Sequence, residues 1–136
     1  MLDTMRKWLE TFPMWEGTLQ LDYADSVPGS TGLYPRGITE LSRREDVLGN
    51  VKVRYSCSFI LRRIAAQRQE NAQWLLELQE WVAQQDRLGL APKFGDEPKT
   101  ERLRAFDGRL DRHSQVGSSL YTVHLSAEFT KIYEVN

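Results

Sequence analysis

The side chains that could do chemistry in this sequence are two histidines, one cysteine, and scattered carboxylates and arginines. His113 and His124 fall in two segments with strand-like patterns, so they could face each other across a hairpin. A zinc site would also need ligands such as Asp111 or Glu128 at the same point. Exposed positions on a sheet are the commoner setting for such residues, and we expect no metal site.

Carboxylates near predicted strand ends are the next candidates for acid–base chemistry. They are Asp22, Asp25, Glu45, Asp46, Asp96 and Glu97. Such residues are ordinarily solvated turn positions rather than a catalytic pair. The sequence has no GxSxG turn, no GxxxxGK[ST] or GxGxxG loop, no HExxH and no pair of cysteines. We therefore predict that the protein is not an enzyme and carries no cofactor.

The arginines offer a different chemistry, because guanidinium groups bind phosphate well. Arg43, Arg44, Arg62 and Arg63 occur as two adjacent pairs, and the segment 102–113 is also rich in arginine. The glutamates and aspartates between these residues argue for cross-strand pairing, and a basic, DNA-facing patch is the alternative. The formal net charge is only −1, so bulk electrostatics favour neither nucleic acid nor an anionic membrane.

The element that must position these groups is the stretch VKVRYSCSFIL, residues 51–61. Its apolar and polar residues alternate strictly, which predicts a long central strand with one buried face. The other face would meet water or a partner. Cys57 lies on the apolar parity, so we expect a buried thiol, and a single cysteine excludes an intrachain disulfide.

Two helices and four more strands are predicted around the central strand. The helices span 2–12, ended by Pro13, and 70–87, with Gly89 as a stop. The larger helix has an apolar face made of Trp74, Leu75, Leu78, Trp81, Val82 and Leu88. The other strands are expected at 15–23, 38–43, 102–113 and 120–134.

Together these segments predict one domain over residues 1–136. The fold class is α+β, a largely antiparallel sheet of about five strands with two packed helices, in the order α-β-β-β-α-β-β. Residues 45–50 would turn the chain into the central strand, and Asp107-Gly108 could mark either a bulge or a break in its strand. Residues 24–37 and 90–100 are predicted as long loops, with Leu33 and Tyr34 near the tip of the first, either folded back as a lid or offered to a partner.

Several stretches together resemble a known family. They are MLDTMRKWLETFPMWEGTLQLDYAD, PGSTGLYPRGITELSRREDVLGNVKVR, NAQWLLELQEWV, APKFGDEP and AEFTKIYEV. In sequence and order they resemble small minor capsid, or tail-terminator, proteins of tailed phages and prophages from low-GC Gram-positive bacteria. The likeness covers nearly the whole chain and rests on whole segments rather than on a catalytic motif.

The resemblance implies a tail-terminator-like fold and a ring of six copies on the end of the tail tube. Such a ring would stop tube polymerisation and join the tail to the head connector. The implied partners are other copies of the chain, the tail-tube protein and the head connector protein, with DNA only in transit and no membrane. The implied location is the virion, and the host cytoplasm during assembly; a monomer in solution is left open.

Candidate contact residues can be named within this interpretation. The two loops offer Leu33, Tyr34, Arg36, Lys93 and Phe94 as contacts with the tube or connector. If DNA passes through the ring, Arg43, Arg44, Arg62 and Arg63 are the candidates to line its lumen.

Two other functions stay open at this point. One is a head-completion or connector-adaptor subunit, which would join head to tail without limiting tail length. The other is a binding or enzymatic domain that acts on the host side and is merely encoded in a prophage.

Overall fold

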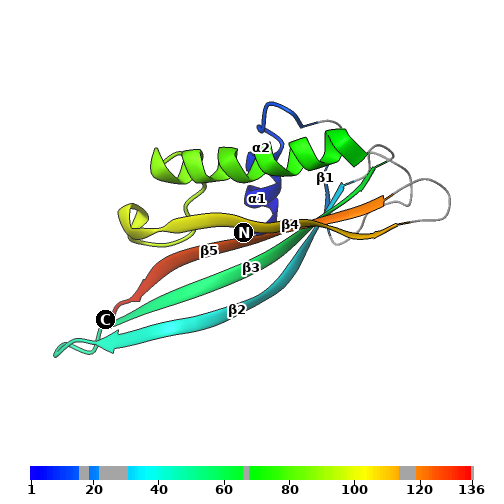
Figure 1. Cartoon of the computed structure of the whole chain (residues 1–136). Coiled ribbons are helices and arrows are strands. Elements are labelled where there is room, and N and C mark those ends of the chain that lie inside the picture. Colours follow the sequence, from blue (N-terminus) through cyan, green and yellow to red (C-terminus); the bar gives the residue numbers. More distant parts are fainter. Residues whose placement is uncertain (16–18, 22–30, 66–67, 114–118, 136) are drawn as a thin grey trace.

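The protein is an α+β fold in which two helices lie on one face of a sheet (Figure 1), and the sheet has four antiparallel strands and one short parallel strand. The computed structural model describes residues 1–15, 19–21, 31–65, 68–113 and 119–135. Its elements are α1 (Leu2–Leu9), β1 (Leu19–Leu21), β2 (Thr31–Glu45), β3 (Val51–Ala65), α2 (Arg68–Arg87), the 3₁₀ helix η1 (Pro98–Thr100), β4 (Arg102–His113) and β5 (Ser119–Tyr133). The predicted fold class is thus confirmed at this level.

The strands lie in the order β1-β2-β3-β5-β4, with β3 at the centre. All pairs are antiparallel except β1, whose three residues run parallel to the start of β2. The central position predicted for residues 51–61 is confirmed, and the strand continues to Ala65. Val53, Cys57, Phe59 and Leu61 are buried on the helix side, as their alternation indicates.

The core lies between this face and the helices. Trp74, Leu78 and Val82 of α2, and Met5 and Leu9 of α1, are buried against it. A helix as short as α1 is marginal in isolation, so this packing must hold it in place. The prediction that Leu88 belongs to the apolar face of α2 is wrong. The helix ends at Arg87, and Leu88 is 57% exposed in the following turn.

A stacked pair of tryptophans joins the two helices. The rings of Trp8 and Trp81 lie 4.7 Å apart between centroids, and Phe12 packs against both Trp74 and Trp81. The N-terminal helix is shorter than predicted, because it ends at Leu9 and a turn carries Phe12 into the core. The tryptophans are therefore packing residues, as the helical spacing indicates.

The predicted loop 24–37 is wrong over residues 31–37, which belong to β2. Residues 24–30 of this predicted loop lie outside the described residues. Of the strand predicted at 15–23, the structure describes Trp15, which is not in a strand, and residues 19–21, which form β1; residues 16–18 and 22–23 lie outside the described residues. Pro35 is tolerated in β2 because the strand is at the edge of the sheet there, where a missing N–H costs least. A register shift between Pro35 and Gly37 absorbs the irregularity.

The C-terminal hairpin has the predicted strands and the predicted bulge. The pairing of β4 with β5 shifts between Phe106 and Arg109, and Asp107 has a φ of 58°. His113 lies opposite Ser119, whereas His124 lies opposite Phe106. The prediction that the two histidines face each other is therefore wrong, because the register of the hairpin separates them along the strands.

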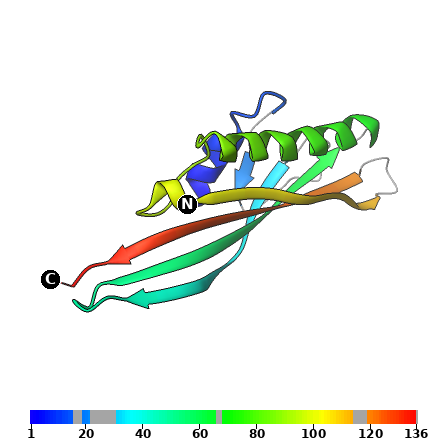
Figure 2. The ribbon, with the colours of Figure 1, turned by 60° about the vertical axis from the view of Figure 1, so that its left-hand side comes forward.

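The sheet is longer than the layer of helices, so the hairpin of β2 and β3 projects past them (Figure 2). Its turn is built by Asp46, whose Oδ1 accepts from the backbone N–H of Leu48 and Asn50 at 2.8 and 3.0 Å. Gly49 supplies the positive φ of 89° that the turn requires. Val135 donates its N–H to Asn50 Oδ1, which fixes the end of β5 against the turn.

Candidate functional site

The sheet face turned away from the helices is the first candidate surface, and we call it the open face. Its side chains alternate along each strand with those of the core. From the strand register it includes Tyr34, Thr39, Ser42, Arg44, Lys52, Arg54, Ser56, Ser58, Ile60, Arg62, Arg102, Arg104, Phe106, Arg109, Thr122, His124, Ser126, Glu128 and Thr130. Arg36 joins it, because it lines a hollow with Ser58 and His124.

The open face is strongly basic. Within the described residues it carries eight cations, Arg36, Arg44, Lys52, Arg54, Arg62, Arg102, Arg104 and Arg109. Three carboxylates contact them, Glu97, Asp107 and Glu128, which leaves a local charge of +5. Because the whole chain has a net charge of −1, the rest of the chain must carry −6. The near-neutral net charge therefore hides an uneven distribution, with positive charge on the open face and negative charge on the rest of the chain.

Only three of these cations are paired with carboxylates. Lys52 Nζ lies 2.7 Å from Glu97 Oε1, and Arg109 Nε lies 3.8 Å from Asp107 Oδ2. Arg54 lies 4.0 Å from Glu128 and also donates to the carbonyl of Thr100 at 2.8 Å. The other five arginines have no carboxylate partner in the described part of the chain: Arg36, Arg44, Arg62, Arg102 and Arg104.

The structure does not bring the four predicted lumen arginines together. Arg43 and Arg44 lie near the β2–β3 turn, while Arg62 and Arg63 lie ten residues along β3. Adjacent residues in a strand also face opposite ways, so Arg44 and Arg62 are on the open face and Arg43 and Arg63 on the helix face. The hydrogen bond from Arg43 to Glu40 raises the pKa of Arg43, and Arg63 lies 4.5 Å over the Trp74 ring.

Sequence reasoning overlooked Arg36, Lys52 and Arg54 as members of this surface. For Lys52 and Arg54 the signal was present, since both lie on the polar parity of the central strand. Arg36 was placed in a loop, and the bulge that brings it beside His124 has no clear mark in the sequence.

The residues predicted as loop contacts differ in how far they are buried. Leu33 is fully buried, at 0% exposure, in the core beneath the helices. Tyr34 is half-buried under the guanidinium of Arg62, whereas Arg36 is exposed. Phe94 packs on Phe129 with ring centroids 6.1 Å apart. Leu33 is thus a core residue in this fold.

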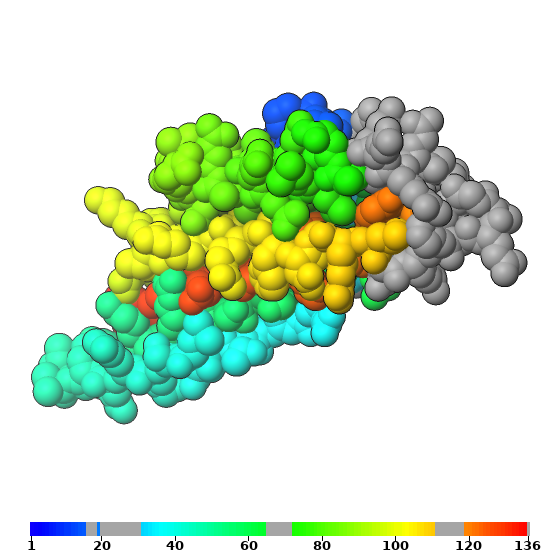
Figure 3. Space-filling model, in the orientation of Figure 1, coloured from blue at the N-terminus to red at the C-terminus, as the bar shows by residue number. Residues whose placement is uncertain are grey.

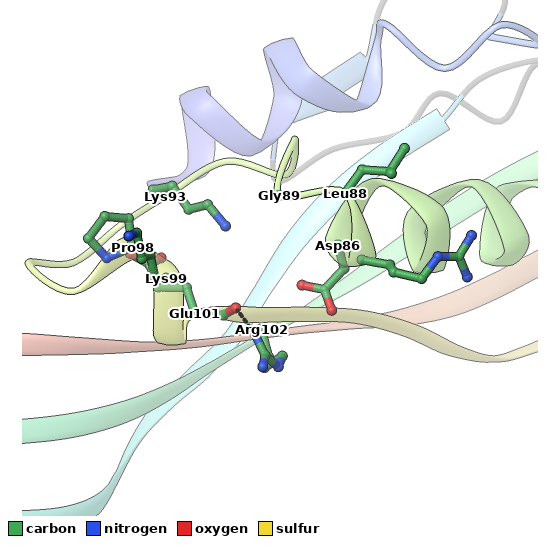
Figure 4. A pocket seen from close by; sticks show the side chains of 9 residues that line it. Asp86, Leu88, Gly89, Lys93, Pro98, Lys99, Glu101 and Arg102 are labelled. Atoms are coloured by element: carbon green, nitrogen blue, oxygen red, sulfur yellow. Dashed lines mark hydrogen bonds between the residues drawn. The ribbon is translucent and has the colours of Figure 1, made fainter.

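Lys93 lines an open depression of about 390 Å³ at the end of α2 (Figure 4). Figure 4 shows Lys99 of η1, Glu101 and Arg102 of β4 on one side of this hollow, and Asp86 of α2 on the other side. Both carboxylates already accept backbone hydrogen bonds. Asp86 takes the N–H of Leu103 at 2.8 Å, and buried Glu101 takes those of residues 94 and 95 at 2.7 and 3.0 Å. These acids therefore build the loop that surrounds the depression.

The projecting hairpin is the second candidate surface. Its β2 strand and turn are exposed from Pro35 to Leu48, including the apolar residues Ile38, Leu41, Val47 and Leu48. Among the described residues, no strand pairs with the outer edge of β2 beyond Leu33. In the space-filling view the hairpin stands clear of the remainder of the molecule (Figure 3). It therefore offers a free strand edge and apolar side chains together.

The other chemical groups are built into the fold. Cys57 is buried, and burial raises the pKa of its thiol, which disfavours a reactive thiolate. No cluster of three or more His, Cys, Asp or Glu side chains suited to a metal ion occurs in the described ranges. Likewise, no helix in those ranges is both long and apolar enough to cross a membrane.

Comparisons with known proteins do not assign this sequence to a family. No protein-family model matches this sequence, and no curated protein matches it. The likeness to phage tail-terminator proteins therefore stays a prediction from the segments quoted above.

Proposed function

We propose that this chain is a structural subunit of phage assembly, a tail terminator that forms a ring on the tail tube and joins it to the head. The observation that carries the proposal is the projecting β2–β3 hairpin. Its apolar residues contribute nothing to the subunit core, since Leu48 is 76% exposed and Val47 is fully exposed. Exposed apolar side chains gathered at one place are typical of a contact with another protein.

The free edge of β2 supports the same proposal. An unpaired strand edge is a template for pairing with another chain, and isolated proteins usually shield it. Within the part of the chain that the structure describes, this edge is unpaired from Tyr34 to Glu45, and it adjoins the apolar residues of the turn. A repeated heterologous contact that covers this edge in each neighbouring copy gives a ring when the rotation between copies closes, which is the arrangement that we propose.

The proposal includes the finer points that the resemblance implies. The fold is of the tail-terminator type, the ring contains six copies, and it contacts the tail-tube and head connector proteins in the virion after assembly in the host cytoplasm. The role that we propose is structural and non-enzymatic.

A paired set of variants tests the hairpin. In a phage that lacks the gene, the wild-type chain is supplied from a plasmid, and Val47→Asp/Leu48→Asp is supplied in parallel. Both positions are exposed, so the free energy of unfolding of the variant should lie within about 0.5 kcal/mol of the wild-type value. We expect wild-type chain to restore plaques and the variant to fail, because the introduced carboxylates would be desolvated at the contact.

The matched control is Leu76→Asp/Leu88→Asp, which adds the same charge at exposed leucines outside the hairpin. This control should restore plaques. Full restoration by the hairpin variant would refute the contact, whereas equal failure of both variants would assign the effect to charge or solubility.

A further inference from the structure

We propose that the open face binds the phosphate backbone of duplex DNA. This inference goes beyond the proposed function, and it does not depend on ring formation because the surface lies within one copy of the chain. The carrying observation is the row of arginines without carboxylate partners on a sheet face that no described helix covers.

The row of cations on the open face runs along the central strand β3. Arg44 lies opposite Lys52 at one end of β3, and Arg62 lies ten residues further along the same strand. A strand rises about 3.3 Å per residue, so the row spans about 33 Å. One turn of B-form DNA is about 34 Å long, so a duplex laid along β3 would meet cations over a full turn.

The side chains between the cations on the open face are mostly small and hydroxylated. Thr39, Ser56 and Ser58 lie on the open face of β2 and β3, and Ser126 lies beside them on β5. The buried side chain of Ile60 lies between Ser58 and Arg62 on the same face of β3. The hydroxyls of Ser56 and Ser126 are 3.3 Å apart. Small hydroxyl side chains between arginines are frequent donors to phosphate oxygens, whereas protein interfaces are centred on apolar and aromatic anchors.

The aromatic rings on the open face favour duplex DNA over single-stranded nucleic acid as the ligand. Proteins that bind single strands need aromatic rings on which bases stack. Here the ring of Tyr34 is covered by Arg62 at 4.9 Å, and Phe106 is stacked on His124 with ring centroids 5.5 Å apart. Arg104 lies over the same Phe106 ring at 5.2 Å. Since these rings are already occupied, the open face is suited to backbone contact.

The test measures binding of the purified chain to a fluorescently labelled 20-base-pair duplex of random sequence by anisotropy, between 50 and 200 mM salt. Five phosphate contacts predict that log K falls with log salt at a slope of about −4 to −5. In Arg44→Glu/Arg62→Glu, two contacts are lost and two repulsive charges are added. We expect affinity at low salt to fall about tenfold or more and the slope to become shallower by about 2.

The matched control is Lys7→Glu/Arg87→Glu, which changes the net charge equally but on exposed residues of the two helices. It should bind DNA within about threefold of the wild type, with the slope unchanged. An equal loss in both double variants would overturn the proposal, because bulk charge would then explain the binding. The proposal would also be overturned if a 20-nucleotide single strand or polyglutamate bound as tightly as the duplex, the latter pointing to an acidic protein partner. None of these outcomes bears on tail length or plaque formation, so the two proposals fail independently.

Discussion

At the scale of single residues, parity along a strand decides which groups can act together. Arg43 and Arg44 are adjacent in sequence, yet one is hydrogen-bonded to Glu40 on the helix face and the other lies on the open face. The same alternation places Cys57 in the core and Ser56 and Ser58 opposite it. A pair of arginines in a sequence is therefore a weak sign of a patch, whereas a run of alternate cations is a stronger one.

Cys57 gives a prediction at this scale. Its side chain is only 8% exposed, and burial raises the pKa of the thiol above the usual value of 9.0. Because the thiolate is the reactive form, less of it is present in the folded protein at pH 8 than in a free cysteine, and reactivity should rise only at more alkaline pH. We expect an aromatic disulfide reagent to label the native protein at least about tenfold more slowly than the urea-unfolded protein at pH 8. Equal rates would show that the central strand opens readily in the native state.

At the scale of elements, packing rather than local preference holds the short helix. The eight residues of α1 have no side-chain cap at their start, and Met5 and Leu9 are fully buried. The aromatic stack of Trp8 on Trp81 ties α1 to α2 as well. The stability of this corner should therefore depend on its buried side chains.

Two leucines test this dependence. Leu9→Ala should lower the free energy of unfolding by about 2–5 kcal/mol, since it leaves a cavity in the core. Leu88→Ala removes the same atoms from a side chain that is 57% exposed, and its cost should stay within about 0.5 kcal/mol. Urea titration followed by tryptophan fluorescence measures both, and similar costs would contradict the burial of α1.

The elements also show how far sequence reasoning reaches. The central strand, α2 and the C-terminal hairpin were predictable because their periods of 2 and 3.6 are sustained over many residues. The start of β2 was not, because Gly32, Pro35 and Gly37 have the composition of a loop, and only the edge position and the register shift accommodate them. Register was also out of reach: the separation of His113 from His124 depends on pairing across the sheet.

The same limit applies to the candidate site. Sequence pattern correctly indicated that one face of the central strand would be buried under the helices and the other would carry mostly polar residues. It did not indicate that cations from three strands would gather there, because that depends on which strands are neighbours. It also placed Leu33 on a loop tip, whereas pairing with Leu61 puts it in the core.

At the scale of the whole molecule, the projecting hairpin brings charge and apolar surface close together. Among the described residues the open face carries +5, in a chain whose net charge is −1. Arg36 and Arg44 of that face lie on the projecting hairpin, whose turn exposes the apolar residues Val47 and Leu48. This arrangement suits a subunit that contacts protein through the turn of the hairpin and a polyanion through the open face.

The most direct test of the central claim is electron microscopy of induced lysates after deletion of this gene from the phage that encodes it. The proposal predicts overlong tails of variable length, separate from DNA-filled heads, and wild-type length after the gene is restored. Free tails of normal length beside filled or leaking heads would contradict length control and indicate a connector adaptor. Intact infectious particles would contradict any role in joining head to tail and indicate a function on the host side.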